Sequence, residues 1–127
     1  MNKFKKLGTN LQGIYIIEPL VFEDSRGFFL ESYNKAEFEE IGIFDEFVQD
    51  NHSKSKRGTL RGLHFQTKHS QAKLIRVIKG KIFDIVVDIR KGSSTYGKWC
   101  GIELSAKNKN MLYIAKGFAH GFFSAGR

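Results

Sequence analysis

The stretch between residues 73 and 90 constrains the fold more than any other part of the chain. Residues 74–78 are mostly apolar, residues 79–81 read Lys-Gly-Lys, and residues 82–89 alternate. In this last segment every second residue is apolar, while those between mix apolar with acidic side chains. A period of two indicates a β-strand. Two such segments joined by a short glycine-containing loop predict a β-hairpin.

Other short apolar segments are bounded by Gly, Asn, Asp or Ser, which are typical of turns. They predict strands at 11–17, 28–32, 59–66, 98–104 and 111–114, whereas only residues 35–41 have a helical pattern. Short strands about every ten residues in a helix-poor chain are typical of a jelly-roll sandwich or barrel. We therefore expect an all-β jelly-roll barrel with one short helix, and a single domain over residues 1–127.

The chain is basic, with 21 Lys and Arg against 13 Asp and Glu and a net charge of +8. Such a surplus attracts anions, whether nucleic acid, acidic lipid or a small phosphorylated substrate. The basic residues are scattered rather than grouped in a tail or along one helix, which disfavours nucleic acid as a partner. No segment has the length of a membrane span and the start lacks a secretory signal, so we expect a cytoplasmic protein without a membrane partner. The single cysteine, Cys100, allows no intramolecular disulfide.

Arg61, Gly62 and His64 fall within one expected strand. On a regular strand, residues three apart point to opposite faces of the sheet. Arg61 and His64 can face one pocket only if Gly62 forms a bulge or kink, a common use of glycine within a strand. Taken alone, this segment leaves His64 open to two interpretations, a catalytic base or an ordinary hydrogen-bonded histidine.

Asp84 and Asp88 share one face of the expected strand at 82–89. Turned inward, these carboxylates would lie near His64 or Lys73 and orient and charge them. Turned outward, they would form the solvated side of the sheet. Lys73 itself opens a strand, so that its ammonium group either enters the barrel or flanks the sheet.

The four histidines suggest a metal site, and barrels often hold one. No His-x-His pair and no glutamate at ligand spacing accompanies them, which disfavours metal binding. His120 lies between glycines and aromatic residues, where a backbone without side chains can approach a ligand closely.

Two polar segments among aromatic residues, around Arg26 and around residues 48–53, fit ligand binding. Asn and Gln amides can read a base edge, an Arg can clasp a diphosphate and a Phe can stack on a ring. The same segments are equally good turn sequences.

Taken together, six ordered motifs closely resemble those of the dTDP-4-dehydrorhamnose 3,5-epimerase family. They are Asp24-Ser-Arg-Gly-Phe, Val48-Gln-Asp-Asn-His-Ser, Leu60-Arg-Gly-Leu-His-Phe-Gln, Lys73-Leu-Ile-Arg-Val-Ile-Lys-Gly, Phe83-Asp-Ile-Val-Val-Asp-Ile-Arg and Gly117-Phe-Ala-His-Gly-Phe. The resemblance implies a cupin-like jelly roll that forms a homodimer. It also implies epimerisation of a nucleotide-linked 4-keto-6-deoxy sugar without metal or coenzyme.

Site residues follow from the same matching. His64 resembles the general base, and Lys73 resembles the cation that stabilises the enolate oxygen. The residues that resemble the family's substrate-binding positions are Arg61 for the diphosphate, Arg26, Glu31, Gln49 and Asn51 for the nucleotide and sugar, His120 for the sugar pocket and Phe22 for stacking on the base. Some of these can reach across a dimer interface.

The chain departs from the family beyond its last motif, because it ends at Arg127. The family's tyrosine proton donor and the acidic partner of its catalytic histidine belong to a further C-terminal part, and no residue here matches either. Tyr113 precedes the last motif and is not assigned the donor role, whereas Asp84 is a local candidate for the partner of His64. We therefore expect a C-terminally short chain that associates to cover sheet edges.

Three functions remain open at this stage. The first is 3,5-epimerisation, and the second is a non-catalytic or single-carbon variant that binds the nucleotide sugar but has lost the tyrosine donor. The third is a metal-dependent cupin. The base, the exact sugar and the identity of the proton donor are not fixed by the sequence.

Overall fold

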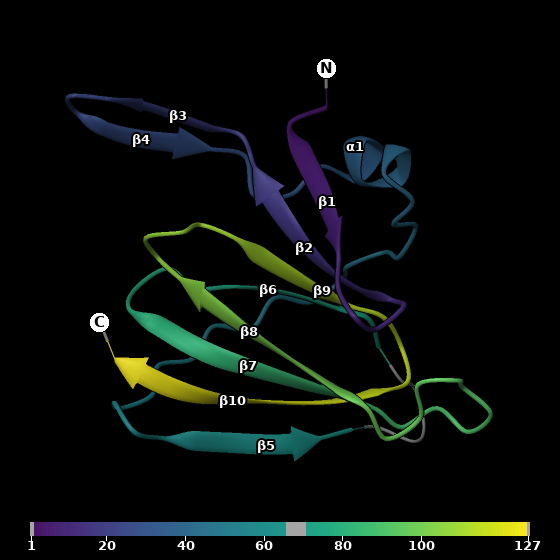
Figure 1. Cartoon of the computed structure of the whole chain (residues 1–127). Helices are drawn as coiled ribbons and strands as arrows, with labels where there is room; N and C mark the ends of the chain where they lie inside the picture. Colours follow the sequence, from purple (N-terminus) through teal and green to yellow (C-terminus); the bar gives the residue numbers. More distant parts are fainter. Residues whose placement is uncertain (1, 66–70, 127) are drawn as a thin grey trace.

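The computed structural model describes residues 2–65 and 71–126, and these form two four-stranded antiparallel sheets and a separate two-stranded hairpin (Figure 1). The strands are β1 (Phe4–Gly8), β2 (Ile14–Pro19), β3 (Val21–Asp24), β4 (Gly27–Leu30), β5 (Leu60–His64), β6 (Lys73–Arg76), β7 (Lys81–Asp88), β8 (Trp99–Ser105), β9 (Met111–Ile114) and β10 (Phe118–Gly126), with the helix α1 (Lys35–Glu40) after β4. The first sheet has the order β1-β2-β9-β6 and the second the order β5-β10-β7-β8, while β3 and β4 pair with each other. The expected all-β jelly roll with one short helix is confirmed.

An apolar core fills the space between the two sheets. Ile14, Leu112 and Ile114 from the first sheet pack with Val86 and Leu104 from the second, and each is at most 2 % exposed. Burial of this apolar surface is the main favourable term that holds the sheets together.

A second core covers the outer face of the first sheet. Asn34 caps α1 by accepting a hydrogen bond from the Glu37 backbone N–H at 3.1 Å, which fixes the start of a helix only six residues long. Phe38 on this helix is fully buried, and its ring meets those of Phe4 and Tyr33 edge to face at 4.8 Å. The helix thus closes one side of the sandwich.

The hairpin expected from residues 74–89 is wrong, although both of its strands exist. Strand β6 pairs with β9 in the first sheet, whereas β7 lies between β10 and β8 in the second. The chain therefore crosses from one sheet to the other around Gly80, which has φ +79°. Crossing allows Ile75 and Val77 to pack against the same core as Val86, and this burial outweighs the local preference for a hairpin.

The outer face of the second sheet remains largely open. The alternating strand β7 buries Asp84, Val86 and Asp88 toward the sandwich interior and turns Phe83 outward. Its mixed apolar and acidic side is thus the inner one. We call the exposed apolar residues of this sheet the apolar outer face; they are Leu60, Leu63, Phe83, Trp99 and Phe123, each at least 40 % exposed.

The other expected strands are present with shifted ends, and that at 111–114 matches β9 at both ends. Strands β1, β3 and β10 were not expected from the sequence. No helix in the described part of the chain is long and apolar enough to cross a lipid bilayer.

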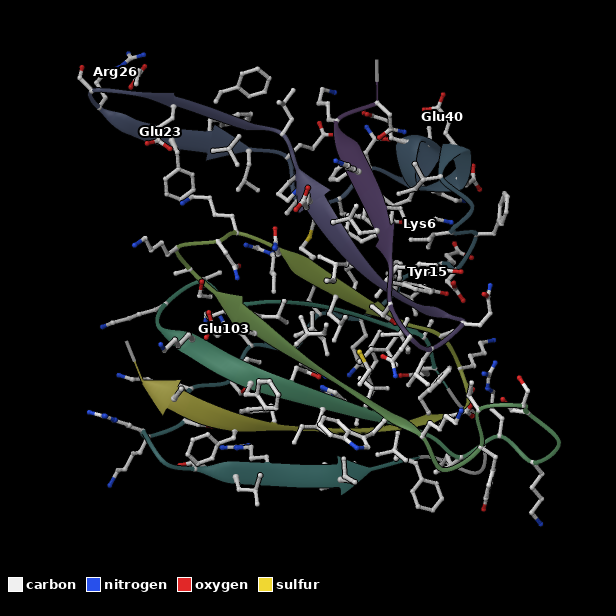
Figure 2. All side chains as sticks on the ribbon, in the orientation of Figure 1. Lys6, Tyr15, Glu23, Arg26, Glu40 and Glu103 are labelled. Carbon is white, nitrogen blue, oxygen red and sulfur yellow. The ribbon has the colours of Figure 1, made fainter. Side chains whose placement is uncertain are left out.

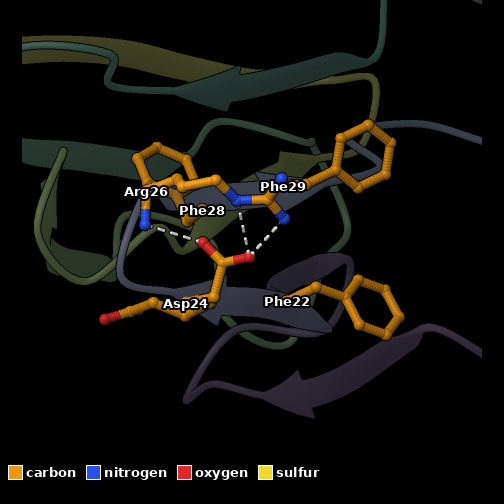
Figure 3. A pocket seen from close by; sticks show the side chains of 7 residues that line it. Phe22, Asp24, Arg26, Phe28 and Phe29 are labelled. Atoms are coloured by element: carbon orange, nitrogen blue, oxygen red, sulfur yellow. Dashed lines mark hydrogen bonds and ion pairs between the residues drawn. The ribbon is translucent and has the colours of Figure 1, made fainter.

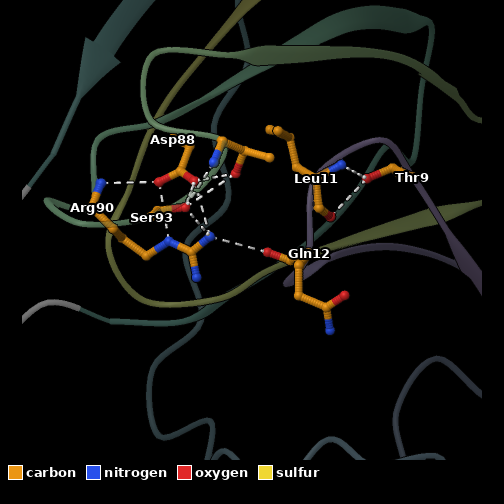
Figure 4. Close-up of polar contacts among 7 residues, drawn as sticks. Thr9, Leu11, Gln12, Asp88, Arg90 and Ser93 are labelled. Atoms are coloured by element: carbon orange, nitrogen blue, oxygen red, sulfur yellow. Dashed lines mark hydrogen bonds and ion pairs between the residues drawn. The ribbon is translucent and has the colours of Figure 1, made fainter.

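Asp88 binds residues of the loop that joins β7 to β8 (Figure 4). Its side chain is fully buried and accepts hydrogen bonds from the Arg90 backbone and guanidinium, at 2.9–3.0 Å, and from the hydroxyls of Ser93 and Thr95. The Arg90 side chain holds the pKa of Asp88 well below its ordinary value, with the two hydroxyls adding to the effect. The charged carboxylate is therefore the form that the fold requires.

We predict that Asp88→Ala lowers the free energy of unfolding by about 2–3 kcal/mol, because it leaves buried donors without an acceptor. Since folding lowers the pKa of Asp88, its stabilising effect is complete above the unfolded value of about 3.9 and is lost as pH falls below it. Urea unfolding between pH 3 and pH 7 measures both effects. If the wild type and Asp88→Asn lose stability in parallel over this range, the ionised Asp88 carboxylate makes no contribution to the free energy of unfolding.

Candidate active site

Strand β5 is bulged at the position that its sequence predicts. His64 pairs with His120 and Arg61 pairs with Phe122, so that three steps along β5 match two along β10. The extra residue shifts the phase of the strand and brings Arg61 and His64 to the same face of the sheet. The expected distortion of the strand at Gly62 is thus present in the register.

The backbones of β5 and β10 approach so closely at the bulge that only glycine fits. Gly62 has φ +102°, and a Cβ added there would lie 2.7 Å from Gly121 Cα and 2.8 Å from the His120 carbonyl oxygen. On the facing strand, a Cβ on Gly121 would lie 2.6 Å from the Arg61 carbonyl oxygen. Two facing glycines thus make the bulge possible.

The sheet register places the face shared by Arg61 and His64 toward the sandwich interior. His120 pairs with Val86 on its other side, and Phe122 pairs with Asp84. Both Val86 and Asp84 are fully buried, and side chains of paired residues share a face. His64 nevertheless remains exposed, because β5 is an edge strand. The edge of the sandwich is thus open at this histidine.

Asp84 and His120 form the central contact of the interior. The His120 Nε2 atom lies 2.8 Å from Oδ1 and 2.9 Å from Oδ2 of Asp84, and the hydrogen bond is to Oδ2. The side chain of Asp84 is 0 % exposed and that of His120 is 13 % exposed. Burial raises the pKa of Asp84, while His120 and then Lys73 pull it back. Asp84 is therefore paired with His120, and within the described residues it makes no hydrogen bond or ion pair with His64.

Lys73 approaches this pair from the opposite sheet. It pairs with the core residue Ile114, and Ile75, two residues along the same strand, packs into the core between the sheets. Lys73 and Ile75 therefore share the inner face of the first sheet. Lys73 is half-buried and acts electrostatically on Asp84 without forming a direct ion pair with it. We call Arg61, His64, Lys73, Asp84 and His120 the interior polar cluster, although Arg61 and His64 are its exposed members at the sheet edge.

The structure does not bring Phe22 and Arg26 to this cluster. Both lie on the β3–β4 hairpin, which projects away from the sandwich with Arg26 at its tip (Figure 2). There Arg26 binds the Asp24 carboxylate through its backbone N–H and through Nε and Nη2, at 2.7–3.2 Å (Figure 3). Phe22, Phe28 and Phe29 are more than half exposed and line an open hollow on the hairpin. The hairpin thus presents an aromatic surface and a guanidinium to the outside.

The remaining expected ligand residues lie outside regular strands. Gln49 donates a hydrogen bond from its amide to Asn51 at 3.0 Å, and both are exposed. Glu31 follows β4 and lies 3.8 Å from the Lys3 ammonium group, while its buried Oε1 atom has no hydrogen bond within the described residues. No hydrogen bond or ion pair within the described residues joins these side chains to His120.

Tyr113 lies on the face of β9 that is turned away from the interior polar cluster. It packs in the core under α1, is 7 % exposed and donates a hydrogen bond to the Asp45 carboxylate. Burial, followed by the effect of Asp45, raises the pKa of Tyr113 far above its ordinary value. This environment is consistent with the exclusion of Tyr113 as a proton donor.

Within residues 2–65 and 71–126, no group of three or more His, Cys, Asp or Glu side chains could together hold a metal ion. His52 is exposed, and His69 lies outside the described residues.

The His120–Asp84 contact was not predicted from the sequence. It depends on strand β10, and the glycines around His120 did not indicate a strand there. The signal was the apolar alternation of Phe118 and Phe122 around His120.

Fold and cluster together define a cupin-like sandwich with polar side chains beside its apolar core. The model of the family described as dTDP-4-dehydrorhamnose 3,5-epimerase matches residues 8–126. Among curated proteins with that name, the one from Methanothermobacter thermautotrophicus is 53% identical over 98% of this chain and 67% of its own length, and the one from Shigella flexneri is 57% identical over 90% and 64%. This chain belongs to the dTDP-4-dehydrorhamnose 3,5-epimerase family.

A solved structure gives the same result in three dimensions. The crystal structure of dTDP-6-deoxy-D-glucose-3,5-epimerase from Legionella pneumophila, in complex with dTDP-4-keto-L-rhamnose, has a TM-score of 0.94 and 48% identity, and covers 97% of this chain and 66% of that one. The chain therefore spans about two thirds of the length of the relatives it matches.

We predict that Gly62→Ala destabilises the protein by about 2–3 kcal/mol, since the new Cβ adds a backbone clash to the strain of a positive φ. Gly58→Ala is the matched control, because Gly58 has φ +87° with open space around its Cβ position, and its cost should be about 1 kcal/mol. Urea unfolding of the two variants measures the difference. Equal losses of unfolding free energy in the two variants would show that the close approach of β5 and β10 does not contribute to the cost of Gly62→Ala.

Proposed function

We propose that this chain catalyses the 3,5-epimerisation of a dTDP-linked 4-keto-6-deoxy sugar, the reaction for which its relatives are named. The observation that carries this proposal is the interior polar cluster, in which a bulged strand sets Arg61 and His64 beside His120 and opposite Lys73. A ketone at C4 acidifies the hydrogens on C3 and C5. Removal of such a proton needs a base on one side and a cation near the ketone oxygen.

His64 is the proposed base. It stands on an exposed edge strand of the sandwich, where a sugar can reach it. Its imidazole takes the proton from C3 or C5, the C–H electron pair forms a C=C bond to C4, and the C4=O π electrons move onto the oxygen. His64 keeps the abstracted proton on one face, and a proton from water reaches the opposite face of the carbon and inverts it.

Lys73 is the proposed enolate stabiliser. It enters from the facing sheet and is half-buried, so a cation at this position acts in a medium of lower dielectric than water. A preorganised ammonium group beside a developing oxyanion typically contributes several kcal/mol to lowering the barrier. Arg61, on the same face as His64, is the proposed diphosphate ligand.

A second function remains, in which the chain binds the nucleotide sugar without catalysis or inverts only one carbon. The specific observation in its favour is that Tyr113 is buried under α1, bonded to Asp45 and turned away from the cluster. Tyr113 therefore does not take the place of the family's proton donor beside His64.

In D2O we expect deuterium to be incorporated at C3 and C5 of dTDP-4-keto-6-deoxyglucose, and NMR measures this exchange. His64→Ala and Lys73→Ala should each slow this exchange at least about 100-fold. Lys79→Ala, which removes an exposed lysine from the loop after the same strand, is the control and should leave exchange unchanged. Binding of dTDP without exchange at either carbon would establish the non-catalytic alternative, and exchange at one carbon the single-carbon variant.

We also infer a homodimer in which the β3–β4 hairpin of one copy supplies Phe22 and Arg26 to the site of the other. A two-stranded hairpin is marginally stable alone, and this one exposes three phenylalanines on its surface. An exposed apolar patch of this kind marks an interaction site. Because the hairpin extends away from the two sheets of its own chain (Figure 1), a second copy is the proposed recipient.

Sedimentation equilibrium should therefore find a dimer at micromolar concentration. Phe28→Ser and Phe29→Ser should each weaken it about tenfold or more, the effect of removing an apolar anchor from an interface. Phe44→Ser is the control, because Phe44 is 71 % exposed but lies after α1 rather than on the hairpin. A well-folded wild-type monomer at this concentration contradicts the inference.

A further inference from the structure

Asp84 occupies a buried place in the fold, where an apolar residue would cost less free energy to bury than a carboxylate. It lies on a central strand of the second sheet, shares its face with the core residue Val86 and is 0 % exposed. Burying a carboxylate costs free energy unless other groups compensate for the lost water. This cost indicates that the carboxylate is kept for what it contacts.

The groups that face Asp84 come from four strands. His120 on β10 makes the direct contact, Lys73 on β6 and Cys100 on β8 interact with it electrostatically, and His64 on β5 pairs with His120. Lys73 lowers the pKa of Asp84 from the facing sheet, so the carboxylate has a second basic neighbour besides His120. His120 is the group close enough to donate a hydrogen bond to it.

The contact also decides which nitrogen of His120 carries the proton. Nε2 lies 2.9 Å from the Asp84 oxygen that accepts its hydrogen bond. When Asp84 is ionised it can only accept, so Nε2 of His120 is then the donor and, in a neutral ring, Nδ1 is the acceptor. Nδ1 makes no hydrogen bond within the described residues. A neutral imidazole held in this way offers one acceptor to a ligand.

We propose that Asp84 is a positioning residue that fixes His120 as the neutral Nε2–H tautomer, so that Nδ1 accepts a hydrogen bond from a hydroxyl group of the sugar. The part that concerns the sugar rests on the proposed function, whereas the tautomer does not. Asp84 acts through His120 and touches no reacting atom.

The tautomer is measured on the 15N-labelled wild-type chain at pH 8, from long-range 1H–15N couplings of the imidazole rings. We expect a proton on Nε2 of His120 only. In Asp84→Leu the ring should lose this preference, whereas Glu103→Gln, which alters an exposed carboxylate of the same sheet, should leave it unchanged. A proton on Nδ1 in the wild type, or an Asp84→Leu spectrum with the wild-type tautomer, overturns the proposal. The wild-type measurement needs no variant and stands even if Asp84→Leu does not fold.

Binding separates a positioning role from a merely structural one. Asp84→Leu and His120→Ala should each weaken binding of dTDP-glucose about tenfold, the value of one hydrogen bond, with binding of dTDP alone unchanged. Equal weakening for both ligands overturns the sugar contact, because it indicates a general structural loss. If the wild type binds neither ligand, the proposed function fails together with the sugar contact, and the NMR result alone decides the tautomer.

Discussion

The packing of two antiparallel sheets against each other sets the conditions for everything else in this molecule. Apolar residues of both sheets supply the burial that holds the sandwich together, yet the same interior contains Asp84 and the half-buried Lys73. A carboxylate in such a place must be matched by donors and opposite charge. His120 and Lys73 meet this need from a neighbouring strand and from the facing sheet. Fold stability and site geometry therefore depend on the same contacts.

The sequence predicted local features well where a single residue type left little choice. A three-residue spacing between Arg61 and His64 allowed one shared face only through a bulge at Gly62, and the register contains that bulge. The turn at residues 24–27 and the strand at 111–114 were likewise determined by local patterns. These features depend on backbone conformation within a few residues, which residue type controls directly.

Long-range features were not predictable in the same way. The alternation in residues 82–89 identified a strand but not its neighbours, and the expected hairpin gave way to a crossover between sheets. Asp84 was expected to serve His64, and it contacts His120 because β10 lies between β5 and β7. Strand order is decided by the burial of whole faces, and a period of two contains no information about it. The place of Phe22 likewise depends on where the β3–β4 hairpin lies, which its local sequence does not determine.

The apolar outer face has a practical consequence through Trp99, the only tryptophan of the chain. Its ring is 59 % exposed and lies beside that of Phe83 above Gly101. Indole emission shifts to shorter wavelength when water is removed from around the ring. The intrinsic fluorescence of this protein is thus a built-in reporter for the outer surface of the second sheet. Any chain segment, second copy or other molecule that settles there will change the emission colour without a label having been attached.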